Sequence, residues 1–203
     1  MDLNLEGPSP QQLKQKLQTA CILALVAAAG LLFAAVSKRW LAAEGVDVGL
    51  GPRGFSCGLG ADDCDPWGES ASNAEVVDKI TQVYKSMGRS GDAPSGLFPI
   101  VGWITLLGCA ISGGALIWAA VTAYKGGVPL KPIPPTTVAL LALMVALIAG
   151  MIFIATHPFR GKGFSALGVS TAFWVFGVCN VLGIVAAQML AKFKQKDPNE
   201  LVI

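Results

Sequence analysis

Four long apolar stretches divide the chain, and segments of mixed polarity separate them. They cover residues 17–36, 97–124, 137–157 and 164–191, and none contains Asp, Glu, Lys or Arg. A helix needs about 20 apolar residues to cross the hydrocarbon of a bilayer, where it satisfies its own backbone hydrogen bonds. The pattern predicts an all-α membrane protein, with residues 1–203 forming a single four-transmembrane-helix bundle.

The beginning of the first stretch also fits a cleaved signal peptide. Against that interpretation, the segment MDLNLEG is acidic rather than basic, and the apolar run exceeds the roughly 7–15 residues of a signal peptide's apolar region. Ser9 can cap a helix, and Pro10 suits the first helical turn. We therefore expect a retained first span whose helix begins before the bilayer.

The longest polar segment, the loop 37–96, has a pattern that predicts an ordered cap. Within it, residues 73–87 form an amphipathic helix, preceded by the capping-box pair Ser72 and Glu75. Its apolar positions recur at helical spacing: Val76, Ile80, Val83 and Met87. We expect this helix to pack on its own loop; the membrane surface and a partner protein are the alternatives.

Composition agrees with a membrane protein. Of the 203 residues, 53% are hydrophobic and 14% are charged, whereas average soluble domains carry about 25% charged residues. The net charge is only +2 and no basic run is interleaved with aromatics, so a nucleic-acid partner is not expected. The expected surroundings are the lipid bilayer and either other membrane proteins or copies of the same chain.

The distribution of lysine and arginine predicts an orientation. With the N-terminus inside, the short inner segments hold seven lysines: Lys14, Lys16, Lys125, Lys131, Lys192, Lys194 and Lys196. The short outer segment 157–163 holds only Arg160 and Lys162, although Lys38 and Arg39 argue mildly the other way. We expect cytoplasmic termini, with the loop 37–96 extracellular or periplasmic.

Two cysteines, Cys57 and Cys64, lie in the Gly-rich stretch FSCGLGADDCDPWG of this loop. An oxidising compartment favours a disulfide between them, and the glycines allow the chain to bend back. We predict this disulfide; two free thiols in a reducing compartment are the alternative. The other three cysteines are expected to be small packing residues within the spans: Cys21, Cys109 and Cys179.

The loop also carries two tryptophans and an acidic cluster. Trp40 and Trp67 are expected to anchor it near the lipid headgroups, where Trp is favoured. The acidic residues are Asp62, Asp63, Asp65 and Glu69. Their oxygens are suitable ligands for Ca²⁺, but the spacing is not that of an EF-hand, so we interpret the cluster as a solvated turn and expect no metal or other cofactor.

Small residues recur at four-residue spacing within the apolar stretches. The predicted packing positions are Gly108 and Ser112 in the second span, Ala142, Ala146 and Gly150 in the third, and Gly183 in the fourth. Such stripes let helices approach closely, within the bundle or against a neighbouring protein. Asn180 is costly to leave unpaired in lipid and is expected to face another helix.

Motifs that carry chemistry are missing from the sequence. His157 is its only histidine, and it contains no Walker loop, HExxH or CxxC motif. Ion and proton pathways usually need ionisable groups within the spans, and these spans hold no Asp, Glu, Lys or Arg. The sequence therefore predicts a protein that is not an enzyme.

The layout resembles the claudin-like tetraspan family, in which the first outer loop carries a Trp, then Gly-Leu-Trp, then two disulfide-bonded cysteines. The corresponding residues here are Trp40, Gly49-Leu50, Cys57 and Cys64. Gly51 stands where that family has its second Trp, the spacings are shorter, and the predicted helix 73–87 falls where the family continues its small sheet. The resemblance implies a structural or junctional protein that associates laterally.

Three functions remain open from the sequence. The first is a structural or accessory subunit that packs against other membrane proteins through its helices and outer loop. The second is a claudin-like adhesion or barrier protein. The third is an oligomeric channel for small ions, with the acidic cluster acting as a cation filter.

Overall fold

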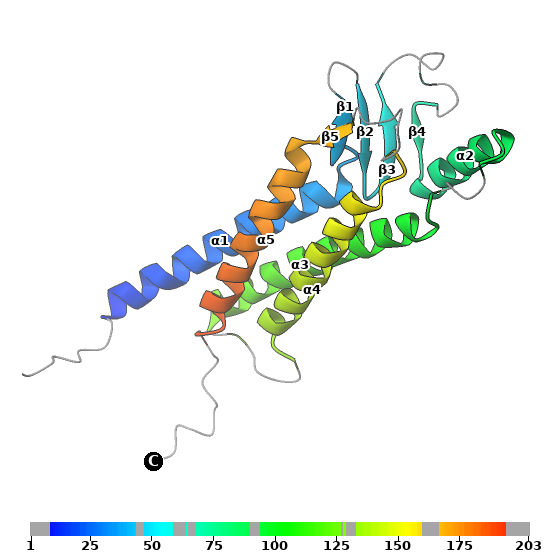
Figure 1. The fold of residues 1–203 in the computed structure, drawn as a ribbon. Helices are drawn as coiled ribbons and strands as arrows, with labels where there is room; N and C mark the ends of the chain where they lie inside the picture. The colour runs from blue at the N-terminus through cyan, green and yellow to red at the C-terminus, as the bar shows by residue number, and fades with distance from the viewer. Residues whose placement is uncertain are drawn as a thin grey trace, which may run out of the picture.

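In the computed structural model, the described residues are 9–43, 47–58, 64, 68–89, 94–126, 128, 133–159 and 167–193. They form a bundle of four long helices, with a small β-sheet and a shorter helix gathered at one end (Figure 1). The predicted bundle is therefore present, but the chain is not all-α.

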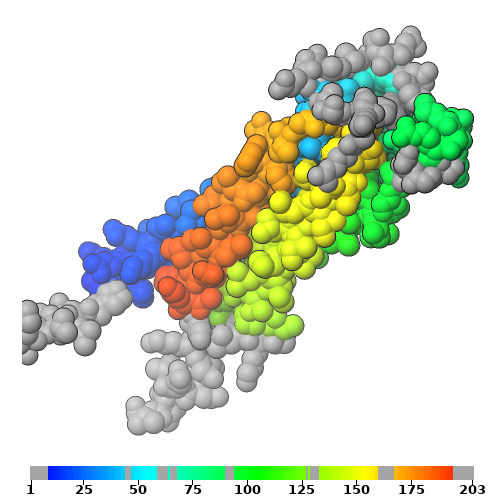
Figure 2. Space-filling view, in the orientation of Figure 1, coloured from blue at the N-terminus to red at the C-terminus, as the bar shows by residue number. Residues whose placement is uncertain are grey.

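The four long helices correspond to the four apolar stretches. They are α1 (Pro10–Val36), α3 (Leu97–Lys125), α4 (Pro135–Ala155) and α5 (Thr171–Leu190). Each is long and apolar enough to cross a membrane. Because α1 and α4 each contact both α3 and α5, the four helices close into a ring. Figure 2 shows α4 and α5 side by side along one face of it.

The start of α1 has the predicted N-terminal cap. The Ser9 hydroxyl accepts a hydrogen bond from the backbone N–H of Gln12, whose side chain accepts one from the Ser9 N–H. Pro10 occupies the first helical position, where its missing N–H has no helical partner to lose. The helix thus begins ahead of the apolar stretch, as expected.

A five-stranded antiparallel sheet corrects the all-α prediction. Its strands are β1 (Leu41–Ala43), β2 (Val48–Gly51), β3 (Gly54–Cys57), β4 (Ser70–Ala71) and β5 (Leu167–Val169), in the order β4-β3-β2-β1-β5. Each strand has at most four residues, too few for an alternating pattern to stand out in the sequence. The sheet exists because the strands pair with each other, which a local pattern does not reveal.

Strand β5 also shortens the predicted fourth span. The stretch 164–191 is continuously apolar, but α5 begins only at Thr171, because Leu167–Val169 pair with β1. The backbone N–H of Ser170 donates to the Trp40 carbonyl at 2.9 Å, and Ser170 is the N-cap of α5. The segment before α5 is thereby joined to the segment after α1.

Helix α2 (Asn73–Ser86) matches the amphipathic helix predicted at 73–87. The capping box between Ser72 and Glu75 is present at its start. Gly88 follows its end with φ +70°, a conformation that glycine adopts without strain. The helix lies beside the sheet and contacts β3 and the beginning of α3 (Figure 1).

The two ends of the bundle differ in their exposed residues. At the sheet end, Trp103 and Trp174 are 64% and 65% exposed, and at the opposite end Tyr124 is 72% exposed. A rise of 1.5 Å per residue separates Trp103 from Tyr124 by about 30 Å along α3, the thickness of a bilayer's hydrocarbon core. Since Trp and Tyr favour the interfaces of a membrane, these bands fit a bundle that spans it lengthwise. We call the opposite end the lysine end, after its described cations: Lys14, Lys16, Lys125 and Lys192.

Candidate functional site

The junction between the sheet and the bundle is built around Trp40. This side chain is completely buried, and its indole N–H donates to the Ala34 carbonyl at 2.8 Å, near the end of α1. Its ring lies 6.0 Å from that of Phe153, 5.6 Å from Phe173 and 4.5 Å from Phe176, measured between centroids. Trp40 therefore connects the loop after α1 with α4 and α5.

A glycine makes room for this aromatic cluster. A Cβ atom at Gly150 would lie 2.8 Å from the Phe176 ring and 3.2 Å from the Trp40 ring. Gly150 was predicted as a helix-packing residue, and its actual neighbours are these rings. Trp40 is not the headgroup anchor that was expected, because it is enclosed by protein on every side. Trp67 lies outside the described residues.

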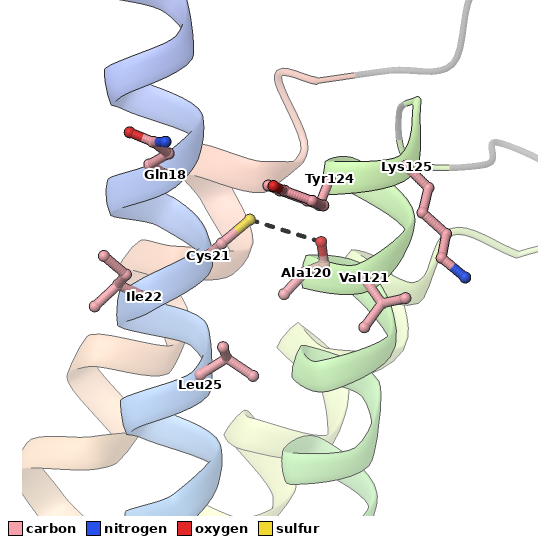
Figure 3. Close-up of a pocket in the computed structure, with 8 residues that line it drawn as sticks. All are labelled: Gln18, Cys21, Ile22, Leu25, Ala120, Val121, Tyr124 and Lys125. Atoms are coloured by element: carbon pink, nitrogen blue, oxygen red, sulfur yellow. Dashed lines mark hydrogen bonds between the residues drawn. The ribbon is translucent and has the colours of Figure 1, made fainter.

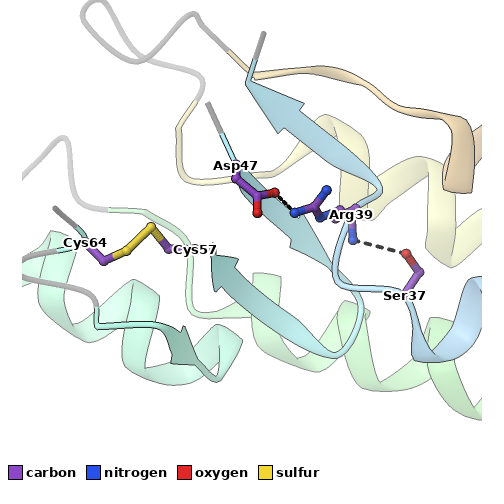
Figure 4. A network of polar contacts seen from close by, with 5 residues as sticks. All are labelled: Ser37, Arg39, Asp47, Cys57 and Cys64. Carbon is purple, nitrogen blue, oxygen red and sulfur yellow. Dashed lines mark hydrogen bonds and ion pairs between the residues drawn. A yellow bond between two sulfur atoms is a disulfide. The ribbon is translucent and has the colours of Figure 1, made fainter. Parts of the chain in front are cut away.

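The predicted disulfide between Cys57 and Cys64 is present, with an S–S distance of 2.02 Å (Figure 4). It joins the end of β3 to the segment that leads to β4, and both cysteines are buried. Backbone hydrogen bonds surround it, from Cys57 N–H to the Glu69 carbonyl at 3.0 Å and from Gly68 N–H to the Cys64 carbonyl at 3.1 Å. The other residues of the predicted acidic cluster, Asp62, Asp63 and Asp65, are outside the described part of the chain.

Two glycines of β2 let the sheet cross closely over the end of α1. A Cβ atom at Gly49 would lie 2.8 Å from the Lys38 carbonyl oxygen, and one at Gly51 would lie 2.3 Å from the Ser37 carbonyl oxygen. The second contact is too short for any side chain without a backbone shift. Position 51 therefore accommodates only glycine in this backbone arrangement.

An exposed ion pair lies on the same crossing. The Arg39 guanidinium contacts the Asp47 carboxylate, and the Arg39 N–H donates to the Ser37 hydroxyl at 3.2 Å (Figure 4). The two side chains of the pair are 54% and 46% exposed. At such exposure water screens the pair, so its contribution to stability is about 1 kcal/mol or less.

Helix α2 covers the sheet with only the first half of its apolar face. Val76 is completely buried and Ile80 is 4% exposed, whereas Val83 is 40% and Met87 is 66% exposed. The Asn73 amide donates at 2.9 Å to the carbonyl of residue 52 and fixes the start of the helix. The expected packing of α2 on its own loop is thus found for its first turns, and the last turn extends beyond it.

Most of the predicted small residues lie at contacts between helices. A Cβ atom at Gly108 would lie 2.9 Å from the Ala146 Cβ, so α3 and α4 approach closely there. One at Gly183 would lie 3.1 Å from Leu143, which brings α5 against α4. Ser112 is buried and donates to the Gly108 carbonyl at 2.6 Å. Ala142 is only half-buried, one turn from this contact.

Asn180 is completely buried, but its hydrogen bond is not to another helix. Its amide donates at 3.1 Å to the Phe176 carbonyl one turn earlier on α5. Among the described residues its Oδ1 atom has no hydrogen-bond partner. Asn180 thus faces the interior of the bundle, and the hydrogen bond described for it stays within α5.

One close contact escaped the sequence pattern. A Cβ atom at Gly30 would lie 2.1 Å from the Cys179 sulfur, so α1 and α5 meet at this pair. Gly30 is not in register with the alanines that recur every four residues on α1, Ala20, Ala24 and Ala28. The signal that could have found it is a lone glycine among larger residues. Cys109 and Cys179 are buried as expected, while Cys21 is half-buried beside Ala120.

The described carboxylates all lie in the segment between α1 and α3, namely Asp47, Glu69, Glu75 and Asp78. The Ser72 backbone N–H donates to the Glu75 carboxylate at 2.7 Å, which lowers the pKa of Glu75, and the Ser72 hydroxyl adds a second hydrogen bond. Within the described ranges, no three His, Cys, Asp or Glu side chains are grouped closely enough to hold a metal ion.

In comparison with known proteins, no family model matches the sequence, and no curated protein matches it significantly.

Proposed function

We propose that this protein is a non-catalytic structural subunit of a membrane, which presents its sheet and α2 as a rigid platform for a neighbouring membrane protein. The platform consists of β1–β5, α2 and the Cys57–Cys64 disulfide. Its partner lies in the same membrane and is either another protein or a second copy of the chain.

The shared core of platform and bundle is the observation that carries this proposal. Trp40 is completely buried among rings from α4 and α5. Strand β5 precedes α5 directly and pairs with β1, which follows α1. A platform fixed at both points cannot swing independently of the helices, so a partner bound to it is held in a defined position relative to the bundle.

Several features support a claudin-like version of this role. Trp40, the Gly49-Leu50 pair and the bonded cysteines follow the order of that family, and the outer segment contains a small sheet. At Gly51, where the chain departs from that order, the backbone arrangement accommodates only glycine. We propose lateral association of this kind, with the platform on the extracellular or periplasmic side.

The exposed end of α2 is the part of the platform best suited to a contact. Val83 and Met87 continue the buried apolar face beyond the sheet, and both are substantially exposed. The channel alternative has no comparable support. In the four long helices that the structure describes, the only charged side chains are Lys14 and Lys16 near the start of α1 and Lys125 at the end of α3.

Site-specific photocrosslinking in native membranes tests the proposal. A photoreactive amino acid is introduced for Met87, and the same amino acid for Lys85 serves as the matched control on the opposite face of α2. We expect a discrete protein adduct from position 87 that is at least about tenfold more abundant than from position 85, since a tenfold ratio requires only 1.4 kcal/mol of preference. Mass spectrometry then distinguishes a second copy from a different membrane protein.

Equal yields of adduct at positions 87 and 85, or adducts with lipid alone at both, would remove α2 as a contact surface. Solubilisation of the protein from its native membrane as a monomer, with no partner retained in mild detergent, would contradict the structural-subunit role as a whole.

A further inference from the structure

A groove between α1 and α3 lies near the lysine end, far along the bundle from the platform. Its volume is about 570 Å³. Ile22 and Leu25 line it from α1, and Val121 lines it from α3. These three side chains are between 43% and 61% exposed, so the groove opens to the surroundings of the bundle. Lipid surrounds a membrane-spanning protein at this level, so an acyl chain is expected to occupy the groove and lie against its walls.

The mouth of the groove is polar. Gln18 lies on α1, and Tyr124 and Lys125 lie in the last turn of α3 (Figure 3). The Tyr124 side chain points across the space toward α1, whereas the Lys125 side chain lies on the side of α3 away from α1. Apolar walls with hydrogen-bonding groups and a cation at one end match the two parts of an amphiphile.

A second hollow, of about 430 Å³, adjoins the first at Tyr124 and Lys125 and brings in a second cation, Lys192. The backbone N–H of Val128 donates to the Phe193 carbonyl at 2.7 Å, which holds the chain after α3 against the end of α5. This hydrogen bond keeps Lys125 and Lys192 on the same hollow, although they come from different helices.

A third cation is placed on the same face by helical register. Lys14 precedes Gln18 by four residues on α1, so the two lie one above the other. Lys16 is displaced from Gln18 by two residues and lies on the opposite face. The part of the lysine end that the structure describes contains no carboxylate, and no described ion pair involves Lys14, Lys125 or Lys192. Positive charge at the mouth is thus not neutralised within the described residues.

We propose that this groove binds one anionic glycerophospholipid, with an acyl chain against Ile22, Leu25 and Val121 and the headgroup phosphate between Lys125 and Lys192. Basic pockets between membrane helices recognise anionic headgroups in this way. The Tyr124 hydroxyl and the Gln18 amide donate hydrogen bonds to the headgroup. A zwitterionic lipid fits the walls equally well, but its own cation cancels the attraction of the lysines.

Lipid binding to the purified full-length protein tests the proposal. Native mass spectrometry compares phosphatidylglycerol with phosphatidylcholine of identical acyl chains. We expect one phosphatidylglycerol per chain, bound about tenfold more tightly than phosphatidylcholine, because each lysine near an anionic headgroup contributes several-fold in affinity. The double substitution Lys125→Gln and Lys192→Gln should remove this preference, and Lys16→Gln, a cation of the same helix end on the other face, should preserve it.

Two further measurements separate the contribution of the apolar groove to lipid binding from the contribution of the lysine charges. Leu25→Trp fills the groove and should weaken binding of both lipids, whereas inorganic phosphate at the same concentration should not displace bound phosphatidylglycerol. Thermal unfolding of each variant shows that it is folded. Equal affinity of the two lipids for the native chain, an equal loss in Lys16→Gln, or displacement by phosphate would each overturn the proposal.

Discussion

At the scale of single residues, the fold depends on how much space a few positions leave empty. Gly108, Gly150 and Gly183 admit neighbours that a methyl group would already crowd, with Cβ positions 2.8–3.1 Å from the nearest atoms. By contrast, nothing lies within 4 Å of a Cβ at Gly114. A glycine in this bundle is therefore a packing residue only where another helix or a ring occupies the space beside it.

Trp40 is the residue whose loss is expected to separate the platform from the bundle. Trp40→Ala should lower the free energy of unfolding by about 3–5 kcal/mol, the usual cost of removing a large buried ring. Trp40→Phe keeps most of the packing and loses the hydrogen bond to Ala34, so it should cost about 1 kcal/mol. Thermal unfolding in detergent, followed by near-UV circular dichroism, measures both.

Trp103→Ala is the matched control for this prediction, because Trp103 is 64% exposed to the surroundings of the bundle. It should change the unfolding midpoint in detergent far less than Trp40→Ala. If the two alanine variants unfold at the same temperature, Trp40 is not the connection we describe.

At the scale of elements, α2 and β5 show how local and non-local forces differ in this chain. Helix α2 has a capping box, an apolar face and a C-terminal glycine, all within 17 residues of sequence. Strand β5 has none of these local signals and exists because β1 offers it hydrogen bonds. The first element is determined by its own residues, and the second by a partner more than a hundred residues away.

The capping box makes the start of α2 sensitive to acid. Hydrogen bonds from the Ser72 backbone and hydroxyl lower the pKa of Glu75 below its usual 4.5. A carboxylate with a lowered pKa stabilises the folded form above its ordinary pKa, and this contribution is lost as the pH falls through the lowered value. We therefore expect the first turn of α2 to be ordered at neutral pH and to loosen below the usual range of Glu.

NMR of the Ser72 and Glu75 backbone amides, recorded in micelles during an acid titration, measures this change. Glu75→Gln should remove the pH dependence, since a neutral amide does not titrate. Ser72→Ala keeps the backbone donor and should raise the pKa of Glu75 only part of the way to its ordinary value. A first turn that stays equally ordered from pH 7 to pH 3 in the native chain would contradict the prediction.

At the scale of the whole molecule, the described carboxylates are confined to one end of the bundle. The carboxylates lie in the platform, the lysine end carries only cations, and four uncharged helical segments lie between them. The sheet end also carries cations, namely Lys38, Arg39, Arg53, Lys79, Lys85 and Arg89. A lysine end on the inside therefore stays a prediction, which rests on the lysines of the short segments.

Accessibility to an impermeant maleimide tests this orientation in intact cells. Ser86→Cys, on the exposed last turn of α2, should be labelled from outside, and Lys16→Cys, on the first turns of α1, only after permeabilisation. Cys57 and Cys64 do not react while bonded, and the native chain gives the background of the other cysteines. Labelling of Lys16→Cys alone in intact cells would show that the orientation is the reverse of the one predicted. Labelling of both variants would contradict a spanning bundle.

The sequence by itself determined the features that depend on neighbours along the chain. Apolar runs of membrane length predicted the four long helices, and capping residues predicted the starts of α1 and α2. The pairing of Cys57 with Cys64 could also be predicted, because they are the only two cysteines of the segment between the first two apolar stretches and lie seven residues apart.

Only the tertiary structure decided the features that depend on contacts between distant segments. The sheet, the burial of Trp40, the contact of Gly30 with Cys179 and the groove beside Lys125 each join helices or strands far apart in sequence. In the sequence, an apolar residue that faces lipid cannot be distinguished from one that faces a neighbouring helix or a strand, because the hydrophobic effect has no direction. Their roles are fixed by which surface comes to lie beside them.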